Sequence, residues 1–259
     1  RRELRDLTDR RFGYPFINCT NCGPRFTVVE SVPYDRARTT MRDFPMCGHC
    51  RLEYDDPADR RFHAEPICCP DCGPQLSLVW KGGDRAEDPV AAAADVLRAG
   101  SVLAVKGLGG YHLAVDATNE AAVALLRSRK QREERPFAVM VGEVTAAGRM
   151  GELSAAETSL LTDPSRPIVL LRRRIGAAVA PSVAPGSDTL GILLAYTPVH
   201  TLLLEAFGGP LVMTSGNAAS EPIAYDDEDA LKPLRGFADP SPLPARRPHP
   251  CPHDPVRRA

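Results

Sequence analysis

Short apolar runs separated by turn residues dominate the chain from about residue 84 onward. Runs of this length, bounded by glycine, proline or polar residues, are typical of strands that are buried in a sheet. The pattern predicts strands at residues 101–105, 111–115, 137–141, 167–171 and 210–213.

Helix signals lie between these runs. Each expected helix follows a residue whose side chain can accept hydrogen bonds from the first turn, and the first and last helices end at a glycine. The expected helices are residues 89–99 after Asp88, residues 119–132 after Thr118, and residues 198–207 after Thr197. Alternating strands and helices predict an α/β sheet covered by helices, and ligands of such sheets bind beyond the strand ends.

Composition and charge exclude two classes of partner. The 259 residues contain 32 Lys and Arg against 33 Asp and Glu, so the chain has no polybasic footprint for nucleic acid. The most apolar stretch, residues 190–213, is interrupted by Pro198, His200 and Glu205, which argues against a membrane span.

The first residues contain no apolar core of a secretory signal, and we expect a cytoplasmic protein. Residue 1 is not Met, which indicates a fragment.

Cysteine spacing is the most specific feature before residue 84. Seven of the eight cysteines lie between Cys19 and Cys72, and six of them form three pairs with CxxC spacing. In a reducing compartment, paired CxxC turns are typical of tetrahedral zinc sites, because one tight turn directs two thiolates at one ion. The pairs are Cys19 and Cys22, Cys47 and Cys50, and Cys69 and Cys72.

An internal repeat indicates which pairs share a metal ion. Residues 9–24 align with residues 59–74 at an offset of 50. The second copy is preceded by a CxxC pair, whereas the matching pair of the first copy would lie at positions -3 and 0, before the chain begins. We therefore expect one complete structural zinc site, formed by Cys47, Cys50, Cys69 and Cys72.

Alternatives to zinc remain open for both sets of cysteines. The complete set could instead form disulfides or a redox-active pair, although a zinc ion with four protein ligands would have no open position for catalysis. Cys19 and Cys22 either bind metal with ligands from outside the chain or stay empty.

A basic cluster ends the second expected helix, just before a buried strand. It contains Arg129, Lys130, Arg132 and Arg135. These side chains form either a phosphate site or a solvated helix end that complements the helix dipole.

Polar groups at strand ends add to this cluster. Lys106 begins a glycine-rich turn whose N–H groups either hold an anion or only close a hairpin. Thr214, Ser215 and Asn217 follow the last strand, where they either bind phosphate or ribose or cap a helix. His112 either touches a substrate carboxylate or carbamate or packs within its strand. Together these groups predict a nucleotide and phosphate site suited to transfer of a nucleotidyl group.

As a set, these motifs resemble those of the maturation carbamoyltransferases of nickel–iron hydrogenases, the HypF family. The resemblance covers residues 1–238 and rests on the repeated zinc knuckles, on VKGLGGYHLAVDATNEAAVALLRSRKQREERPFAVMV and on PLVMTSGN. It implies an α/β fold, a YrdC-like twisted mixed sheet with helices, preceded by a small cysteine-rich zinc-binding domain. The implied domains are a zinc-finger region at residues 1–83 with a truncated first finger and a complete second one, a YrdC-like domain at 84–238, and a proline-rich disordered tail at 239–259.

The resemblance also implies an activity. In this family the YrdC-like domain joins ATP, supplied with Mg²⁺, to carbamate released from carbamoyl phosphate, and forms carbamoyl-adenylate and pyrophosphate. Another domain passes the carbamoyl group to the C-terminal cysteine of a partner protein, as a precursor of a cyanide ligand of the hydrogenase iron. A chain with only the zinc region and the YrdC-like domain would keep the adenylating step alone.

The resemblance assigns the helix-end and strand-end groups to ATP. Its expected nucleotide-binding residues are Lys130, Arg132, Arg135, Thr214, Ser215 and Asn217. Lys106 and His112 are further candidate contacts, and no catalytic residue is assigned. Arg135 stands where the family usually has lysine before proline, which keeps the charge but changes the geometry of the donors.

The tail departs most from the family pattern. Residues 240–259 contain seven prolines and almost no large apolar residues, so we expect neither a strand nor a packed helix there. The abrupt change in composition motivates the hypothesis of a shifted reading frame near Ala238.

Two other functions remain open from the sequence. YrdC-like domains can bind double-stranded RNA through a basic concave surface, and the cluster at residues 129–135 is compatible with this, whereas the neutral overall charge is not. Threonylcarbamoyl-adenylate synthesis, the activity of a related family, is disfavoured by the zinc repeat and by GLGGYHL in place of the threonine-bearing loop of that family.

Overall fold

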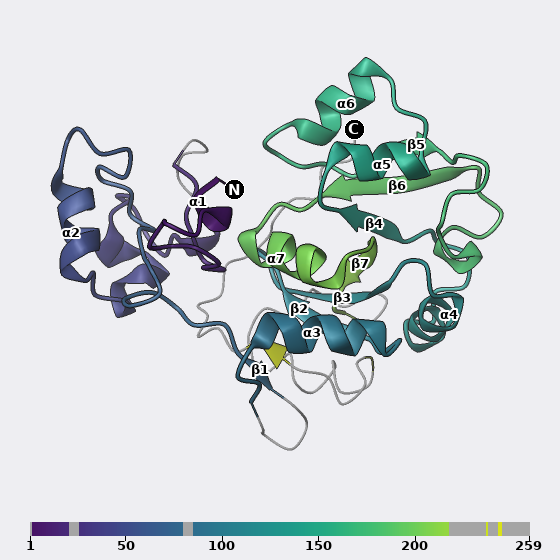
Figure 1. Ribbon diagram of the computed structural model, residues 1–259, viewed down its shortest axis with the longest axis horizontal. Coiled ribbons are helices and arrows are strands. Elements are labelled where there is room, and N and C mark those ends of the chain that lie inside the picture. Colours follow the sequence, from purple (N-terminus) through teal and green to yellow (C-terminus); the bar gives the residue numbers. More distant parts are fainter. Residues whose placement is uncertain (1, 21–25, 80–84, 218–236, 238–242, 245–259) are drawn as a thin grey trace.

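The chain folds into two lobes that Figure 1 shows side by side. A computed structural model describes residues 2–20, 26–79, 85–217, 237 and 243–244. The first lobe contains short helices and turns around small buried clusters. Small regions without a large core are usually held together by disulfides or by a bound metal ion. Its helices are α1 (Arg2–Arg5) and α2 (Gly48–Asp55), with the 3-10 helices η1 (Phe26–Val28), η2 (Arg36–Arg38) and η3 (Thr40–Asp43).

The second lobe is built on a six-stranded mixed sheet with strand order β2-β3-β7-β4-β6-β5. Among these strands only β4 and β6 pair in parallel. The strands are β2 (Leu103–Lys106), β3 (Tyr111–Asp116), β4 (Ala138–Val141), β5 (Val169–Arg172), β6 (Thr189–Leu194) and β7 (Leu211–Ser215). The expected mixed α/β sheet is therefore confirmed.

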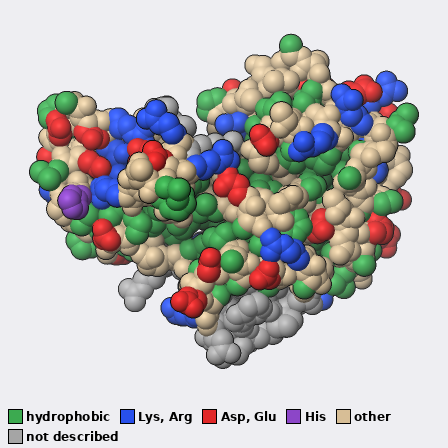
Figure 2. Space-filling view, viewed as in Figure 1, with side chains coloured by type: hydrophobic (Ala, Val, Ile, Leu, Met, Phe, Trp, Pro, Cys, Tyr) green, Lys and Arg blue, Asp and Glu red, His purple; other side chains and the backbone are tan. Residues whose placement is uncertain are grey.

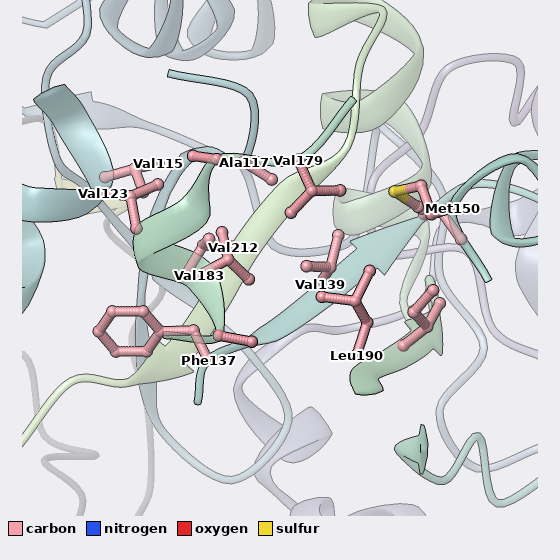
Figure 3. Close-up of a cluster of buried hydrophobic side chains, with 14 of the residues drawn as sticks. Val115, Ala117, Val123, Phe137, Val139, Met150, Val179, Val183, Leu190 and Val212 are labelled. Carbon is pink, nitrogen blue, oxygen red and sulfur yellow. The ribbon is translucent and has the colours of Figure 1, made fainter. Parts of the chain in front are cut away.

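Alternate residues of the strands face two separate cores. In β2, Ala104 enters one core and its neighbour Leu103 enters the other. Figure 3 shows the first core, where Val139 of β4, Leu190 of β6 and Val212 of β7 lie together. Strands buried on both faces carry near-continuous apolar runs, which is the pattern that the sequence shows.

Helices cover both faces of the sheet. The core on the Leu103 side is closed by α3 (Pro89–Arg98) and α7 (Pro198–Phe207). The other core is closed by α4 (Glu120–Arg129), α5 (Val144–Met150), α6 (Ala155–Thr162) and the 3-10 helix η4 (Pro181–Val183). The predicted caps of α3 and α7 are confirmed, because the Asp88 carboxylate accepts two N–H groups at 3.0 Å and the Thr197 hydroxyl accepts one at 3.1 Å.

The sequence prediction lacks β6, α5 and α6. β6 runs almost directly into α7 within the most apolar stretch of the chain, where periodicity alone does not separate a buried strand from a buried helix. α5 and α6 are only seven and eight residues long, too short for a clear helical period. The five strands that the sequence predicts are confirmed, with ends displaced by one or two residues.

Both ends of α4 differ from the predicted ones. The Asn119 side chain, rather than that of Thr118, accepts a hydrogen bond from the first turn, at 3.1 Å. The Thr118 hydroxyl instead donates to the Asp116 carboxylate at 2.7 Å, because the chain is still turning away from β3 there. The helix ends at Arg129, earlier than expected, since Gln131 has a left-handed φ of 48° that a helix does not accommodate.

Part of the tail contradicts the sequence prediction. Leu243–Pro244 forms strand β8, which pairs antiparallel with β1 (Leu78–Val79), although the proline content predicts no strand there. One two-residue pairing needs little propensity, because an edge strand tolerates proline. The other residues of the tail lie outside the described part of the chain. None of the described helices is long and apolar enough to span a lipid bilayer.

Replacing Asn119 tests the cap of α4. We expect Asn119→Ala to lower the free energy of unfolding by about 1 kcal/mol, because the first turn loses its side-chain acceptor. Thr118→Ala is the matched control and should cost less than about 0.5 kcal/mol, since that hydroxyl bonds only an exposed carboxylate. Urea unfolding of both variants measures the difference, and a larger loss at Thr118 would contradict the assignment.

Candidate functional site

Four cysteine sulfurs meet in the first lobe. The Sγ atoms of Cys47, Cys50, Cys69 and Cys72 all lie within 4.8 Å of one another, with neighbours 3.6, 3.7 and 3.8 Å apart. A tetrahedral zinc ion with Zn–S bonds of about 2.3 Å requires sulfurs about 3.8 Å apart. A disulfide bond would be about 2.05 Å long, so no disulfide joins these sulfurs, and the alternative of a redox-active pair stays open. The expected ligand set thus fits zinc.

Two local turns position these sulfurs. Cys47 is the N-cap residue of α2, so Cys50 lies in the first helical turn, where it is fully buried. The Cys69 carbonyl oxygen accepts hydrogen bonds from the N–H groups of Cys72 at 3.2 Å and Gly73 at 2.8 Å. A Cβ atom at Gly73 would collide with the neighbouring side chains, so this turn requires glycine.

The remaining described cysteines lie outside the cluster. Cys19 is exposed, and its expected partner Cys22 lies outside the described residues, so metal binding by this pair stays a prediction. Cys68 is buried, and its Sγ donates to the carbonyl oxygen of Phe16 at 3.4 Å. This contact fits a structural thiol rather than a ligand.

In the second lobe, a buried lysine joins the two segments that the sequence predicts to bind phosphate. Lys130 caps the C-terminus of α4 and is only 6% exposed. Its Nζ donates to the carbonyl oxygens of Ser215 at 2.5 Å and Asn217 at 2.8 Å. Burial, and to a lesser extent the charge of Arg132, lowers the pKa of Lys130 to about 8. The basic end of α4 and the loop after β7 therefore form one site.

The loop after β7 is held in place by its own polar groups and by β3. The Ser215 hydroxyl donates to the Asn217 side-chain oxygen at 2.5 Å. The N–H of Gly216 donates to the carbonyl oxygen of Tyr111 at 2.7 Å, and the strand register sets His112 opposite Ser215. The expected nucleotide-loop residues are thus ordered beside Lys130.

Arg132 links the loop between α4 and β4 to the end of β7. It donates to the carbonyl oxygens of Arg135 at 3.1 Å and Pro136 at 2.6 Å. Its Nη1 also lies 3.5 Å from the hydroxyl of Thr214. The side chain of Arg135 itself is exposed, so it faces solvent beside this site.

Arg127 organises the loop of the basic cluster, and the sequence pattern did not single it out. It donates to three carbonyl oxygens of the 132–135 loop at 2.6 to 3.1 Å. Its guanidinium group and that of Arg132 lie 4.6 and 4.9 Å from the centroid of the Phe137 ring, in cation–π contact. Its only sequence signal is its place two residues before the basic cluster, and an arginine there is usually solvated.

Lys106 lies at the start of a hairpin turn. The N–H of Gly107 donates to the carbonyl oxygen of Gly110 at 2.8 Å, so the glycine-rich turn closes a hairpin between β2 and β3. Anion binding by its N–H groups stays a prediction. The Lys106 Nζ lies 5.2 Å from the centroid of the Tyr111 ring. Contact of Lys106 with a ligand stays a prediction.

His112 belongs to a group of three rings beneath the site. The Tyr196 hydroxyl lies 3.4 Å from His112 Nε2, and the ring centroids of Tyr196 and His200 are 4.5 Å apart. His112 Nδ1 and both ring nitrogens of His200 have no hydrogen-bond partner among the described residues. Burial lowers the pKa of His112 to about 4, with a smaller effect of the charge on Lys130, and lowers that of His200 to about 3. Both rings are therefore neutral at pH 7.

The geometry suits an anionic ligand. Lys130, Arg132 and the Thr214 hydroxyl converge beside the loop after β7, where cations and donors favour phosphate. An ammonium group has three N–H donors, so Lys130 can hold the loop and still donate to a ligand. Binding of double-stranded RNA through residues 129–135 stays a prediction, and Arg127, Arg129 and Arg132 each already donate to a carbonyl oxygen of the protein.

Comparisons with known proteins agree with this architecture. A family model described as "Telomere recombination", covering Sua5, YciO and YrdC proteins, matches residues 95–241. A second, the "HypF finger", matches residues 1–29 and 46–79. The carbamoyltransferase HypF of Rhodobacter capsulatus is 55% identical over 230 residues, which are 89% of this chain and 31% of that protein.

Two further relatives extend this picture. A crystal structure of full-length HypF in a phosphate- and nucleotide-bound form has a TM-score of 0.89 at 49% identity, over 95% of this chain and 32% of that one. The threonylcarbamoyl-AMP synthase of Bos taurus is 30% identical over 163 residues, 60% of this chain and 59% of that protein. The chain thus spans about a third of the length of the HypF proteins that it matches.

Cys50→Ser tests the metal cluster. We expect this variant to carry one zinc equivalent less than the unchanged chain, because a serine hydroxyl is a poor zinc ligand compared with a thiolate. Cys68→Ser is the matched control, since Cys68 is similarly buried but lies outside the cluster. Elemental analysis of the purified variants gives the zinc content, and equal zinc loss in both would refute the ligand assignment.

The lowered pKa of buried His200 predicts that the folded chain loses stability in acid. Its pKa is about 3 in the folded chain against an ordinary value of 6.5, so the unfolded chain binds more protons between these values. The stability that depends on neutral His200 is therefore complete above pH 6.5 and is lost as the pH falls toward 3. In His200→Phe, the free energy of unfolding should decline less steeply on acidification. Denaturant unfolding at several pH values measures this, and equal slopes would speak against it.

Proposed function

This chain belongs to the Sua5, YciO and YrdC family and carries a HypF finger, and we propose that its second lobe forms carbamoyl-adenylate from ATP and carbamate. The activity would be the adenylating step of a HypF-type carbamoyltransferase, of which this chain spans about a third. The nucleotide and phosphate named for the full-length HypF structure support a nucleotide substrate.

The contact of Lys130 with the loop after β7 carries the proposal. Through it, a buried ammonium group, the Arg132 guanidinium and the polar residues of the loop come together at the strand ends. Ligands of α/β sheets bind at such strand ends. In this position the two cations can neutralise a triphosphate, while the loop residues contact the rest of the nucleotide.

The proposed step is attack of a carbamate oxygen on the α-phosphorus of ATP. A P–O bond forms to the carbamate, the bond from the α-phosphorus to the oxygen that bridges to the β-phosphate breaks, and its electron pair leaves with pyrophosphate. Such a reaction depends on positioning and on charge neutralisation more than on a protein nucleophile. Lys130 and Arg132 would stabilise the charge on the phosphate oxygens, with Arg135 beside them. Mg²⁺ would arrive on the ATP phosphates and keep part of its water shell.

The proposal also assigns residues that contact the nucleotide and residues that contact the carbamate. Thr214, Ser215 and Asn217 would orient the nucleotide through their hydroxyl and amide groups. His112 would approach the carbamate as a neutral ring, because its pKa of about 4 leaves it uncharged at pH 7. Lys106, from the neighbouring hairpin, would add a positive charge to the same end.

The proposal also covers the metal ion of the first lobe and the reactions before and after adenylation in the longer protein. The four-cysteine cluster would hold one zinc ion as a structural group, because four thiolates leave no open position for a substrate. In the longer protein, carbamate would come from carbamoyl phosphate, and the carbamoyl group would pass to the C-terminal cysteine of a partner protein of hydrogenase maturation.

One comparison favours a second candidate function. The 30% identity with a threonylcarbamoyl-AMP synthase would fit the same adenylation chemistry with threonine and bicarbonate in place of carbamate. The HypF finger and the higher identity to HypF make this the weaker candidate.

Isothermal titration with ATP and Mg²⁺ tests the nucleotide site. We expect Lys130→Ala to weaken binding by about tenfold or more, because a charge-assisted hydrogen bond contributes roughly 1.5–3 kcal/mol. Arg129→Ala is the matched control one residue earlier, since its guanidinium donates to the carbonyl oxygen of Phe237 at 2.9 Å. It should leave the affinity within about threefold. Equal weakening by the two variants would count against a phosphate site at Lys130.

Exchange of labelled pyrophosphate into ATP identifies the second substrate. Ammonium bicarbonate solutions contain carbamate, so exchange there without threonine is the outcome expected for carbamoyl-adenylate. Exchange that requires threonine and bicarbonate, and does not respond to ammonium, would instead support the second candidate.

A further inference from the structure

The sequence repeat of the first lobe is also a structural repeat. We define the first copy as residues 1–24 and the second copy as residues 47–74, which align from residue 51 onward. The N–H of Gly13 donates to the carbonyl oxygen of Leu4 at 3.0 Å, and the N–H of His63 donates to that of Tyr54 at the same distance. Gly13 and His63 correspond at the offset of 50 and both have a left-handed φ, 65° and 48°. Each copy is therefore closed in the same way.

Ion pairs between the two copies join residues that correspond in the repeat. Arg10 and Arg11 of the first copy bind Glu53 of the second, with closest N–O distances of 2.8 and 2.5 Å. Figure 2 shows how basic and acidic side chains are interleaved on the surface of this lobe.

The reverse exchange uses the matching positions. Arg60 and Arg61 of the second copy bind Glu3 of the first, at 2.6 Å for Arg61. Glu3 corresponds to Glu53, and the two arginine pairs correspond as well, at the offset of 50. The copies therefore pack like the halves of a twofold-symmetric dimer, in which a contact and its reverse occur together.

The two arginines of the first copy also contact a sulfur of the four-cysteine cluster. Arg10 Nη2 and Arg11 Nη2 lie 3.2 and 3.5 Å from the Sγ of Cys50. Arg11 is 1% exposed and is fixed further by its Nε, which donates to the carbonyl oxygen of Cys68 at 2.8 Å. Guanidinium groups stay protonated at all relevant pH values, so both arginines are permanent donors toward this sulfur.

A further negative group would compensate the charge at this place. Two guanidinium groups face one carboxylate, Glu53, and the Arg11 side chain is only 2% exposed, so an unpaired positive charge there is costly. A zinc ion with four thiolates has a net charge of about -2. The cluster and the arginines would therefore compensate each other.

We infer that Arg10 and Arg11 hold the Cys50 thiolate toward its metal, so that the first copy controls how tightly the second copy retains zinc. The arginines act through the ligand and do not touch the metal, which makes them positioning residues. Groups that donate to a metal ligand commonly change metal affinity by about 10- to 100-fold when they are removed.

Arg10→Gln tests the inference, with Arg60→Gln as its matched control. Both arginines are partly exposed and both bind the glutamate of the other copy. Within the described residues, only Arg10 of this pair lies at hydrogen-bond distance from a cluster sulfur. In the 259-residue chain, competition with a chelator of known affinity should show zinc binding about 10- to 100-fold weaker for Arg10→Gln. Arg60→Gln should change it by less than about threefold.

Cobalt substitution gives a readout that a general loss of stability would not move. Removing an N–H donor raises the energy of the sulfur lone pairs, so the sulfur-to-cobalt charge-transfer band of Arg10→Gln should shift to longer wavelength. The band of Arg60→Gln should not shift. Arg10→Lys keeps the charge and N–H donors but loses the planar fork of the guanidinium group, and it should restore part of the affinity.

Either of two results would overturn the inference: equal weakening of zinc binding in both variants, or an unshifted cobalt band in Arg10→Gln. If Arg10→Gln does not fold, Arg10→Met and Arg60→Met are compared by the same two criteria, because methionine has no N–H donor. ATP titration of the same variants separates this inference from the proposed function, because the second lobe contains the nucleotide site.

Discussion

The insertion of β7 between β3 and β4 is the constraint on which the second lobe depends. β7 comes last among the strands of this sheet, yet it pairs antiparallel with both neighbours and contributes to both cores. The same pairing sets His112 opposite Ser215 and brings the loop after β7 to the end of α4. Lys130 then donates to the carbonyl oxygens of Ser215, at the end of the strand, and of Asn217, just beyond it. The candidate site exists because β7 lies between β3 and β4, which brings the loop after β7 next to Lys130.

The two lobes are stabilised by different interactions. The second lobe buries strands on both faces, so its stability comes from apolar packing in two continuous cores. The first lobe has only small apolar clusters, and its copies are joined by arginine–glutamate pairs and by the four-cysteine cluster. A metal ion in this cluster would stabilise the lobe, because thiolates and guanidinium groups without a partner are costly to bury.

Local chemistry made some features predictable and left others open. Asp88 and Thr197 were identifiable as caps because each directly precedes a proline that favours the first helical turn. Thr118 and Asn119 are adjacent and both can cap a helix, so only the geometry of the turn after β3 decides between them. β6 and α7 share one apolar stretch, in which composition does not show where a strand ends and a helix begins.

The sequence alone determined the repeat, most of the strands and a set of four cysteines whose spacing predicts a zinc site. CxxC spacing specifies a tetrahedral thiolate set within a few residues, and an apolar run specifies a buried strand regardless of its neighbours. The tertiary structure decided which side chains serve the two sites. Arg127 organises the loop of the basic cluster, Lys130 bonds a loop 85 residues away, and Arg10 reaches Cys50 across the repeat. A hydrogen bond between distant residues depends on strand order and on the packing of whole units, and neither is encoded in the residues next to the donor.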